Sequence, residues 1–172
     1  MFDQVIESTI LLFVAVDPIA LIPIFASLTQ GLSKQDIKTV YINASFVSFG
    51  ILSAFWLFGA SLLGVMGISM SSFKIIGGLF LIAIAFQMVF EQRQERRQNT
   101  ADTALDDESL QSLAIFPLAT PLIAGPGAMT AVLLLAEERS NEPLEMLINF
   151  TPILAIVLMA AIAMWLSANL AN

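Results

Sequence analysis

The 172-residue chain is 58% hydrophobic and only 12% charged, whereas soluble domains carry about 25% charged residues. This composition leaves too little polar surface for a soluble domain, so we expect a compact bundle of membrane-spanning helices. The sequence has no cysteine or histidine, which excludes disulfides, thiolate metal sites and histidine-based catalysis, and its net charge of −7 gives no indication of a nucleic-acid partner.

Long uncharged stretches predict the helices, because a span needs about 20 predominantly apolar residues. In chain order we expect five helices near 5–28, 39–65, 71–90, 111–136 and 146–170. Two glycines and small polar residues at 64–69 suit a tight turn between the second and the third. A soluble core would require five helices that are apolar on all sides. The predicted fold class is therefore an all-α polytopic membrane bundle.

The first helix and the basic residues predict the orientation in the membrane. The N-terminus carries Asp3 and Glu7 but no basic segment, so we expect a retained first helix rather than a cleaved signal peptide. Most basic residues fall in the first and third loops, on one side of the membrane: Lys34, Lys38, Arg93, Arg96 and Arg97. The positive-inside rule then predicts cytoplasmic first and third loops and an outside N-terminus, in a bacterial inner membrane.

One hydrophilic segment divides the chain. Residues 91–108 carry nine charged side chains of both signs and cannot bury enough apolar surface to fold alone. The predicted organisation is a three-helix unit at 1–90, a cytoplasmic linker at 91–110, and a two-helix unit at 111–172.

The two units share short motifs in the same order. Asp17-Pro18 in the first helix matches Gly125-Pro126 in the fourth, and Asn43 in the second matches Asn149 in the fifth. Three helices separate the copies, so the second copy would enter the membrane from the opposite face. The pattern predicts an inverted-topology repeat of the kind common in secondary transporters, with an incomplete second copy.

Helix-breaking residues mark the predicted binding site. Proline removes a hydrogen bond from a helix, and broken helices occur in membranes where they face protein or a wet cavity. The breakers lie in the first and fourth spans, and the candidate site residues at these breaks are Asp17, Pro18, Gly125, Pro126 and Gly127. The alternative is that the prolines only kink the helices for packing.

Asp17 is the acidic residue that lies well inside a span, where a carboxylate costs about 2.5–3.5 kcal/mol to insert. Such a residue usually faces the bundle interior, and we expect it to bind substrate or a coupling cation. It could instead cap a helix that begins at Pro18. Asn43 and Asn149 complete the candidate substrate-binding set, with hydrogen bonding between helices as the alternative role.

These residues carry a resemblance to a known family. The chain resembles the MarC family of bacterial integral membrane proteins in four segments: Asp17–Ala20, Gly67–Ser69, Phe73–Gly78 and Pro117–Ala128. The resemblance implies an inner-membrane protein with two three-helix repeats. It also implies cation-coupled transport of small neutral amino acids, as described for similar archaeal members. The family has six spans, so the sixth helix has no counterpart among the five predicted here, and homo-oligomerisation through the uncovered face is one expectation.

Two functions follow as hypotheses. The first is a secondary transporter for small neutral amino acids or similar solutes, coupled to protons or sodium. The second is a non-transporting membrane partner or regulatory protein. We expect no enzyme activity and no cofactor, because the sequence contains no paired intramembrane carboxylates, no nucleophile elbow and no zinc-protease motif.

Overall fold

The computed structural model describes residues 2–90, 93, 95–99, 110–137 and 142–170, which form helices and no strand. In chain order the helices are α1 (Phe2–Val16), α2 (Pro18–Leu28), α3 (Lys34–Val65), α4 (Met70–Val89), α6 (Leu110–Leu113), η1 (Ala114–Ile123), α7 (Pro126–Glu137) and α8 (Pro143–Leu170). Four described stretches, with α1 and α2 taken together, are long and apolar enough to cross a membrane. There are five if η1 and α7, bent by 58°, count as one span. The predicted all-α polytopic bundle is confirmed.

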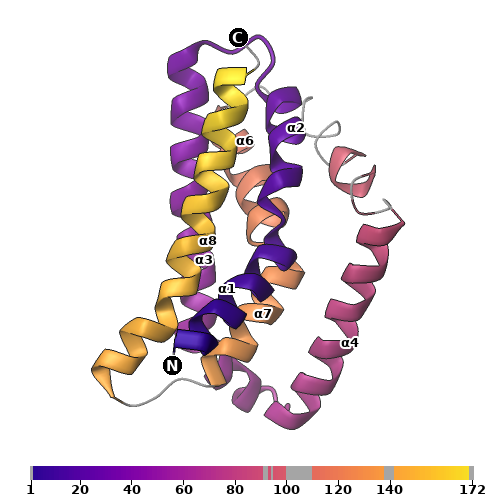
Figure 1. Ribbon diagram of the computed structural model, residues 1–172, viewed down its shortest axis with the longest axis vertical. Coiled ribbons are helices and arrows are strands. Elements are labelled where there is room, and N and C mark those ends of the chain that lie inside the picture. Colours follow the sequence, from indigo (N-terminus) through magenta and orange to yellow (C-terminus); the bar gives the residue numbers. More distant parts are fainter. Residues whose placement is uncertain (1, 91–92, 94, 100–109, 138–141, 171–172) are drawn as a thin grey trace.

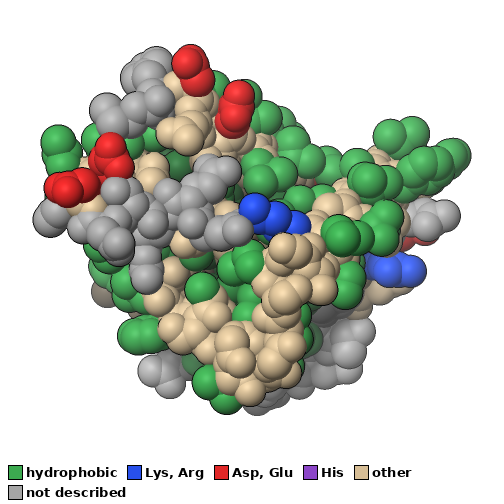
Figure 2. Space-filling model, turned by 90° about the horizontal axis from the view of Figure 1, so that it is seen from below, with side chains coloured by type: hydrophobic (Ala, Val, Ile, Leu, Met, Phe, Trp, Pro, Cys, Tyr) green, Lys and Arg blue, Asp and Glu red, His purple; other side chains and the backbone are tan. Residues whose placement is uncertain are grey.

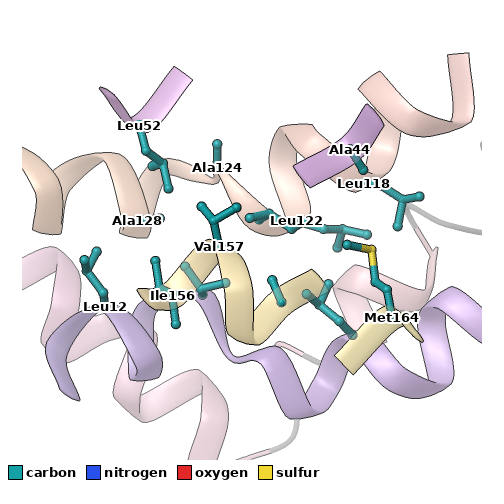
Figure 3. Packing of buried hydrophobic residues seen from close by; sticks show 14 of the residues in the cluster. Leu12, Ala44, Leu52, Leu118, Leu122, Ala124, Ala128, Ile156, Val157 and Met164 are labelled. Carbon is teal, nitrogen blue, oxygen red and sulfur yellow. The ribbon is translucent and has the colours of Figure 1, made fainter. Parts of the chain in front are cut away.

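The core lies between the long helices α3 and α8 and the broken pairs α1–α2 and η1–α7 (Figure 1). Side chains from all of them meet in one buried apolar cluster, part of which Figure 3 shows. Its fully buried members include Leu12, Phe25, Leu52, Leu118 and Ile156. Apolar burial gives little net gain in lipid, so tight packing is what holds such helices together.

Helix α4 stands apart from this core (Figure 1). Only Gly77 and Ile84 are buried along it, and it packs mainly on α7. A Cβ atom on Gly77 would lie 3.0 Å from Thr130 Cγ2, so this glycine permits the close approach of α4 to α7. The remaining faces of α4 are apolar and exposed, which suits contact with lipid.

The first span, predicted at 5–28 with helix breakers inside it, is present and interrupted at Asp17. α1 ends at Val16 and α2 begins at Pro18, with Asp17 between them in the left-handed conformation (φ 54°, ψ 70°). Pro18 has no N–H to continue the hydrogen bonding of α1, but its φ suits the first position of a new helix. The chain therefore restarts as α2 at this proline.

The fourth span, predicted at 111–136 with helix breakers inside it, is likewise interrupted, because η1 and α7 are bent by 58° at a break. Phe116 and Thr120 have extended backbone conformations inside η1, and each precedes a proline. Clash with the proline ring disfavours the helical conformation for the preceding residue, which explains both irregular positions. A regular helix, α7, starts only at Pro126.

The second helix begins five residues earlier than predicted. Ser33 caps α3 by accepting a hydrogen bond from the Asp36 N–H at 3.2 Å, a signal that a search for uncharged stretches overlooks. At the other end of α3, the predicted tight turn between the second and third spans is present, and Gly67 allows it with a φ of +69°.

Candidate solute site at the two helix breaks

Asp17 joins the two halves of the first span. Its backbone N–H donates to the Phe13 carbonyl at 2.8 Å and so closes α1. Its side-chain Oδ1 accepts from the Ala20 N–H at 3.3 Å and so caps α2. The capping role considered from the sequence is therefore confirmed, and it leaves the second carboxylate oxygen for other partners.

The break leaves the last carbonyl groups of α1 without helical partners, as at any helix C-terminus. Pro18 contributes to this, because it has no N–H to donate back to Val14. Two arginines supply the missing donors. Arg93 donates to the carbonyls of Val14, at 3.1 Å, and Ala15. Arg97 donates to the carbonyl of Val16 at 2.8 Å.

Arg97 also connects the first break to the second. Its guanidinium lies 3.9 Å from Asp17 Oδ2, and it donates to the Leu122 carbonyl of η1 at 3.4 Å. The residue is only 8% exposed, so these bonds form away from water. Its neighbour Gln98 donates to Ser27 Oγ of α2 at 3.4 Å. The segment that follows α4 is thereby attached to both broken helices.

The charge on these arginines is retained in spite of burial. Burial and the nearby Arg93 lower the pKa of Arg97 to about 10, while Asp17 acts in the opposite direction. Burial likewise lowers the pKa of Arg93, again opposed by Asp17. A pKa of about 10 still leaves Arg97 protonated at neutral pH. Two positive charges therefore lie at the negative end of the α1 dipole, where cations are favoured.

A cavity of about 360 Å³ opens beside the arginines. Its polar lining comes from Arg93, Arg96 and Arg97, together with Gln87 of α4. Residues 125–127 at the start of α7 also line it, with apolar side chains in the remainder. A helix N-terminus presents unpaired N–H groups and a positive partial charge. The cavity therefore combines three guanidinium groups with a helix N-terminus, a lining that suits a small anionic group.

The glycines at the second break allow its close packing. A Cβ on Gly125 would lie 2.3 Å from the Pro121 carbonyl oxygen, which is backbone and cannot move aside cheaply. A Cβ on Gly127 would lie 2.5 Å from Ile84 Cδ1, the flexible end of a side chain on α4. Gly125 thus permits the sharp bend before α7, and Gly127 permits the contact between α7 and α4.

Of the seven predicted site residues, the structure places three at the cavity and two at the first break, where Asp17 is linked to the cavity through Arg97 but does not line it. Asp17 and the buried Pro18 form the first break, and residues 125–127 line the cavity at the second, with Arg97 between them. Asn43 and Asn149 lie elsewhere. Asn43 is half-buried on α3 and lines none of the cavities described here, and Asn149 borders a separate hollow of about 10 Å³. Their expected role in binding stays a prediction.

Arg93, Arg96, Arg97 and Gln87 were not among the predicted site residues. The arginines fell in the predicted hydrophilic linker, whereas Arg93 and residues 95–99 are helical and Arg97 is buried. The rest of the predicted linker lies outside the described residues. One signal was available: Arg93, Arg96 and Arg97 follow the spacing of neighbours on one face of a helix.

A cation at Asp17 remains a prediction as well. Within the described part of the chain, no group of three or more Asp, Glu, His or Cys side chains could hold a metal ion. Asp17 is paired with Arg97, so the positive charge beside its carboxylate is the guanidinium.

The interrupted helices and the apolar surface define a multi-pass α-helical membrane protein. Comparison with known proteins gives the family: residues 2–172 match the MarC family integral membrane protein, and the chain belongs to that family.

Among the relatives are proteins described as UPF0056 membrane proteins. One from Methanocaldococcus jannaschii is 36% identical over 76% of this chain and 57% of its own length. One from Buchnera aphidicola is 37% identical over 69% of this chain and 54% of its own length. YvbG from Bacillus subtilis is 29% identical over 82% of this chain and 67% of its own length. The chain thus spans little more than half the length of the first two relatives. No solved structure matches it.

Proposed function

We propose that this protein is an inner-membrane secondary transporter that binds small neutral amino acids, or similar zwitterions, at the two helix breaks. The observation that supports it most is the cavity of about 360 Å³ lined by Arg93, Arg96, Arg97 and the start of α7. Substrate sites in secondary transporters typically lie at interrupted helices, and this cavity is lined both by Ala15 near the end of α1 and by the start of α7.

The cavity provides one half of a zwitterion site. A solute carboxylate would be held by the guanidinium groups, which suit the planar carboxylate geometry, and by the N–H groups at the start of α7. A volume of about 360 Å³ accommodates glycine or alanine with room to spare and lies within the range of pockets for larger ligands, so the proposed substrate class rests on the charged lining and not on the volume.

The first break provides the other half. The Asp17 carboxylate and the carbonyls at the end of α1 suit an ammonium group, because each accepts hydrogen bonds from a cation. Coupling to protons or sodium is part of the proposal, since a carboxylate inside a span usually belongs to an ion pathway or proton relay.

Charge at the two ends of the bundle supports the proposed orientation. Exposed acidic residues lie where α1 and α8 begin: Asp3, Glu7, Glu142 and Glu145. Figure 2 looks at this end and shows acidic side chains gathered over part of it. Lys34 and Lys38 lie at the opposite end, where α3 begins (Figure 1). Under the positive-inside rule the lysine end is cytoplasmic and the N-terminus is outside.

Ligand-dependent stabilisation of the purified chain tests this function. The protein would be placed in lipid nanodiscs and melted with glycine, L-alanine, propionate or ethylamine at equal ionic strength. At ten times the Kd, a ligand that binds only the folded state raises the Tm of a chain of this size by about 4 °C. We expect this shift with the two amino acids and smaller shifts with propionate and ethylamine, which each carry one of the two charges.

The alternative, a non-transporting membrane partner, has one observation in its favour. Nearly the whole apolar surface of α4 is exposed, with only Gly77 and Ile84 buried. If no amino acid shifts the Tm of the folded protein, the zwitterion site is rejected and the non-transporting partner becomes the preferred hypothesis.

A further inference from the structure

We propose that the C-terminal end of α1 is a receptor for small cations with N–H groups, and that Arg93 and Arg97 fill it from within the chain. The cations in question are guanidinium and primary ammonium. The inference deepens the proposed function, because the ammonium group of a zwitterionic solute belongs to this class and would have to displace an arginine.

The last carbonyls of α1 accept hydrogen bonds mainly from cationic N–H groups. Phe13, the first of its last four residues, is bonded by the Asp17 N–H in the ordinary helical way. The next three carbonyls, of Val14, Ala15 and Val16, all accept from guanidinium N–H groups. The end of α1 is thus saturated by N–H donors that bear positive charge.

The surroundings are built for such a cation. The Asp17 carboxylate lies 3.9 Å from the Arg97 guanidinium and offers a negative charge on the same side. The Leu122 carbonyl from the second break adds an acceptor at 3.4 Å. Carbonyls from two broken helices and one carboxylate therefore converge on one buried guanidinium, an arrangement that would leave unsatisfied acceptors if the cation were removed.

The proposal requires that the arginines can release these carbonyls while the bundle stays folded. Arg93 and residues 95–99 follow α4, which itself packs little against the core. The bonds of the segment to the broken helices include those of the arginines and that of Gln98 to Ser27. In this proposal the carbonyls bind either an arginine of the chain or an external cation, and not both at once.

Chemical rescue tests the receptor directly. The Arg93→Ala/Arg97→Ala variant in nanodiscs would be melted with guanidinium, methylammonium, sodium or choline chloride at low millimolar concentration and constant ionic strength. Melting can be followed by tryptophan fluorescence from Trp56 and Trp165. We expect a saturable rise of about 4 °C at ten times the Kd with guanidinium, and a rise with methylammonium. Choline, which has no N–H, should give none, and any response of the wild-type protein to guanidinium or methylammonium should be smaller than that of the variant, because its own arginines occupy the carbonyls.

Two controls keep the result interpretable. Arg96→Ala removes an exposed arginine of the same segment and should not create a response to guanidinium. If the double variant does not fold, Arg97→Ala alone vacates the buried part of the receptor. A response that is equal in wild type and variant, or that is as large with choline or sodium as with guanidinium, overturns the proposal, as does a folded variant with no response.

These outcomes are separable from the proposed function. Rescue by guanidinium without any effect of amino acids on the wild-type protein would retain the receptor and reject the zwitterion site. Stabilisation by amino acids without rescue would do the reverse.

Discussion

At the scale of single residues, Asp17 combines two tasks that can be separated by mutation. Its Oδ1 caps α2, and its Oδ2 faces Arg97. Asparagine still accepts the capping hydrogen bond and tolerates the left-handed backbone. Alanine has no side-chain acceptor for the cap and is strained in that conformation. We therefore expect Asp17→Ala to lower the free energy of unfolding by about 1–2 kcal/mol more than Asp17→Asn, as measured by SDS titration in mixed micelles. Equal losses would show that the cap adds nothing.

Arg97 and Arg96 form a matched pair on the same segment. Arg97→Ala leaves buried carbonyls and Asp17 without a partner, so we expect a loss of about 2–4 kcal/mol in the free energy of unfolding. Arg96 is exposed, and because an exposed ion pair is worth at most about 1 kcal/mol, its replacement by alanine should cost no more than that. The same titration measures both, and similar effects of the two variants would contradict the geometry of the break.

At the scale of helices, the glycines at the second break differ in what surrounds them. Gly125→Ala sets a Cβ against the Pro121 backbone, so we expect a loss above about 2 kcal/mol. The Cβ of Gly127→Ala would come too close only to Ile84 Cδ1, at 2.5 Å, so the loss should be smaller and partly restored by Ile84→Val, which lacks that atom. A Cβ on Gly50 of α3 would meet nothing within 4 Å, which makes Gly50→Ala the control. Failure of Ile84→Val to rescue Gly127→Ala in the thermal melt would argue against this contact.

The helices also show how far the sequence could predict the structure. Spans appear directly as apolar stretches, and prolines identify where two of them are interrupted. Hydropathy could not show that Phe116 and Thr120 leave the helix, because that follows from the local clash with the next residue. Hydropathy also does not show that arginines from a polar stretch donate hydrogen bonds to carbonyls of a distant helix. Val16 and Arg97, for example, are 81 residues apart and meet only in the folded chain.

At the scale of the whole molecule, the proposed orientation in the membrane is based on the charges at the two ends of the bundle. The sequence has no cysteine, so single-cysteine variants report accessibility without background. We expect Asp3→Cys to react with a membrane-impermeant maleimide on intact cells. Gln35→Cys, near the start of α3, should react only after permeabilisation. The opposite labelling pattern would reverse the proposed topology.

The central claim is that a small amino acid binds between the two breaks and crosses the membrane there. The most direct test is uptake of labelled glycine and alanine into proteoliposomes under proton or sodium gradients. This chain and the longer Bacillus subtilis relative would be compared, with Asp17→Asn and Gly50→Ala variants of this chain. We predict uptake that survives Gly50→Ala and falls at least tenfold in Asp17→Asn while that variant stays folded. Uptake unchanged by Asp17→Asn, or no uptake by either protein, would contradict the account.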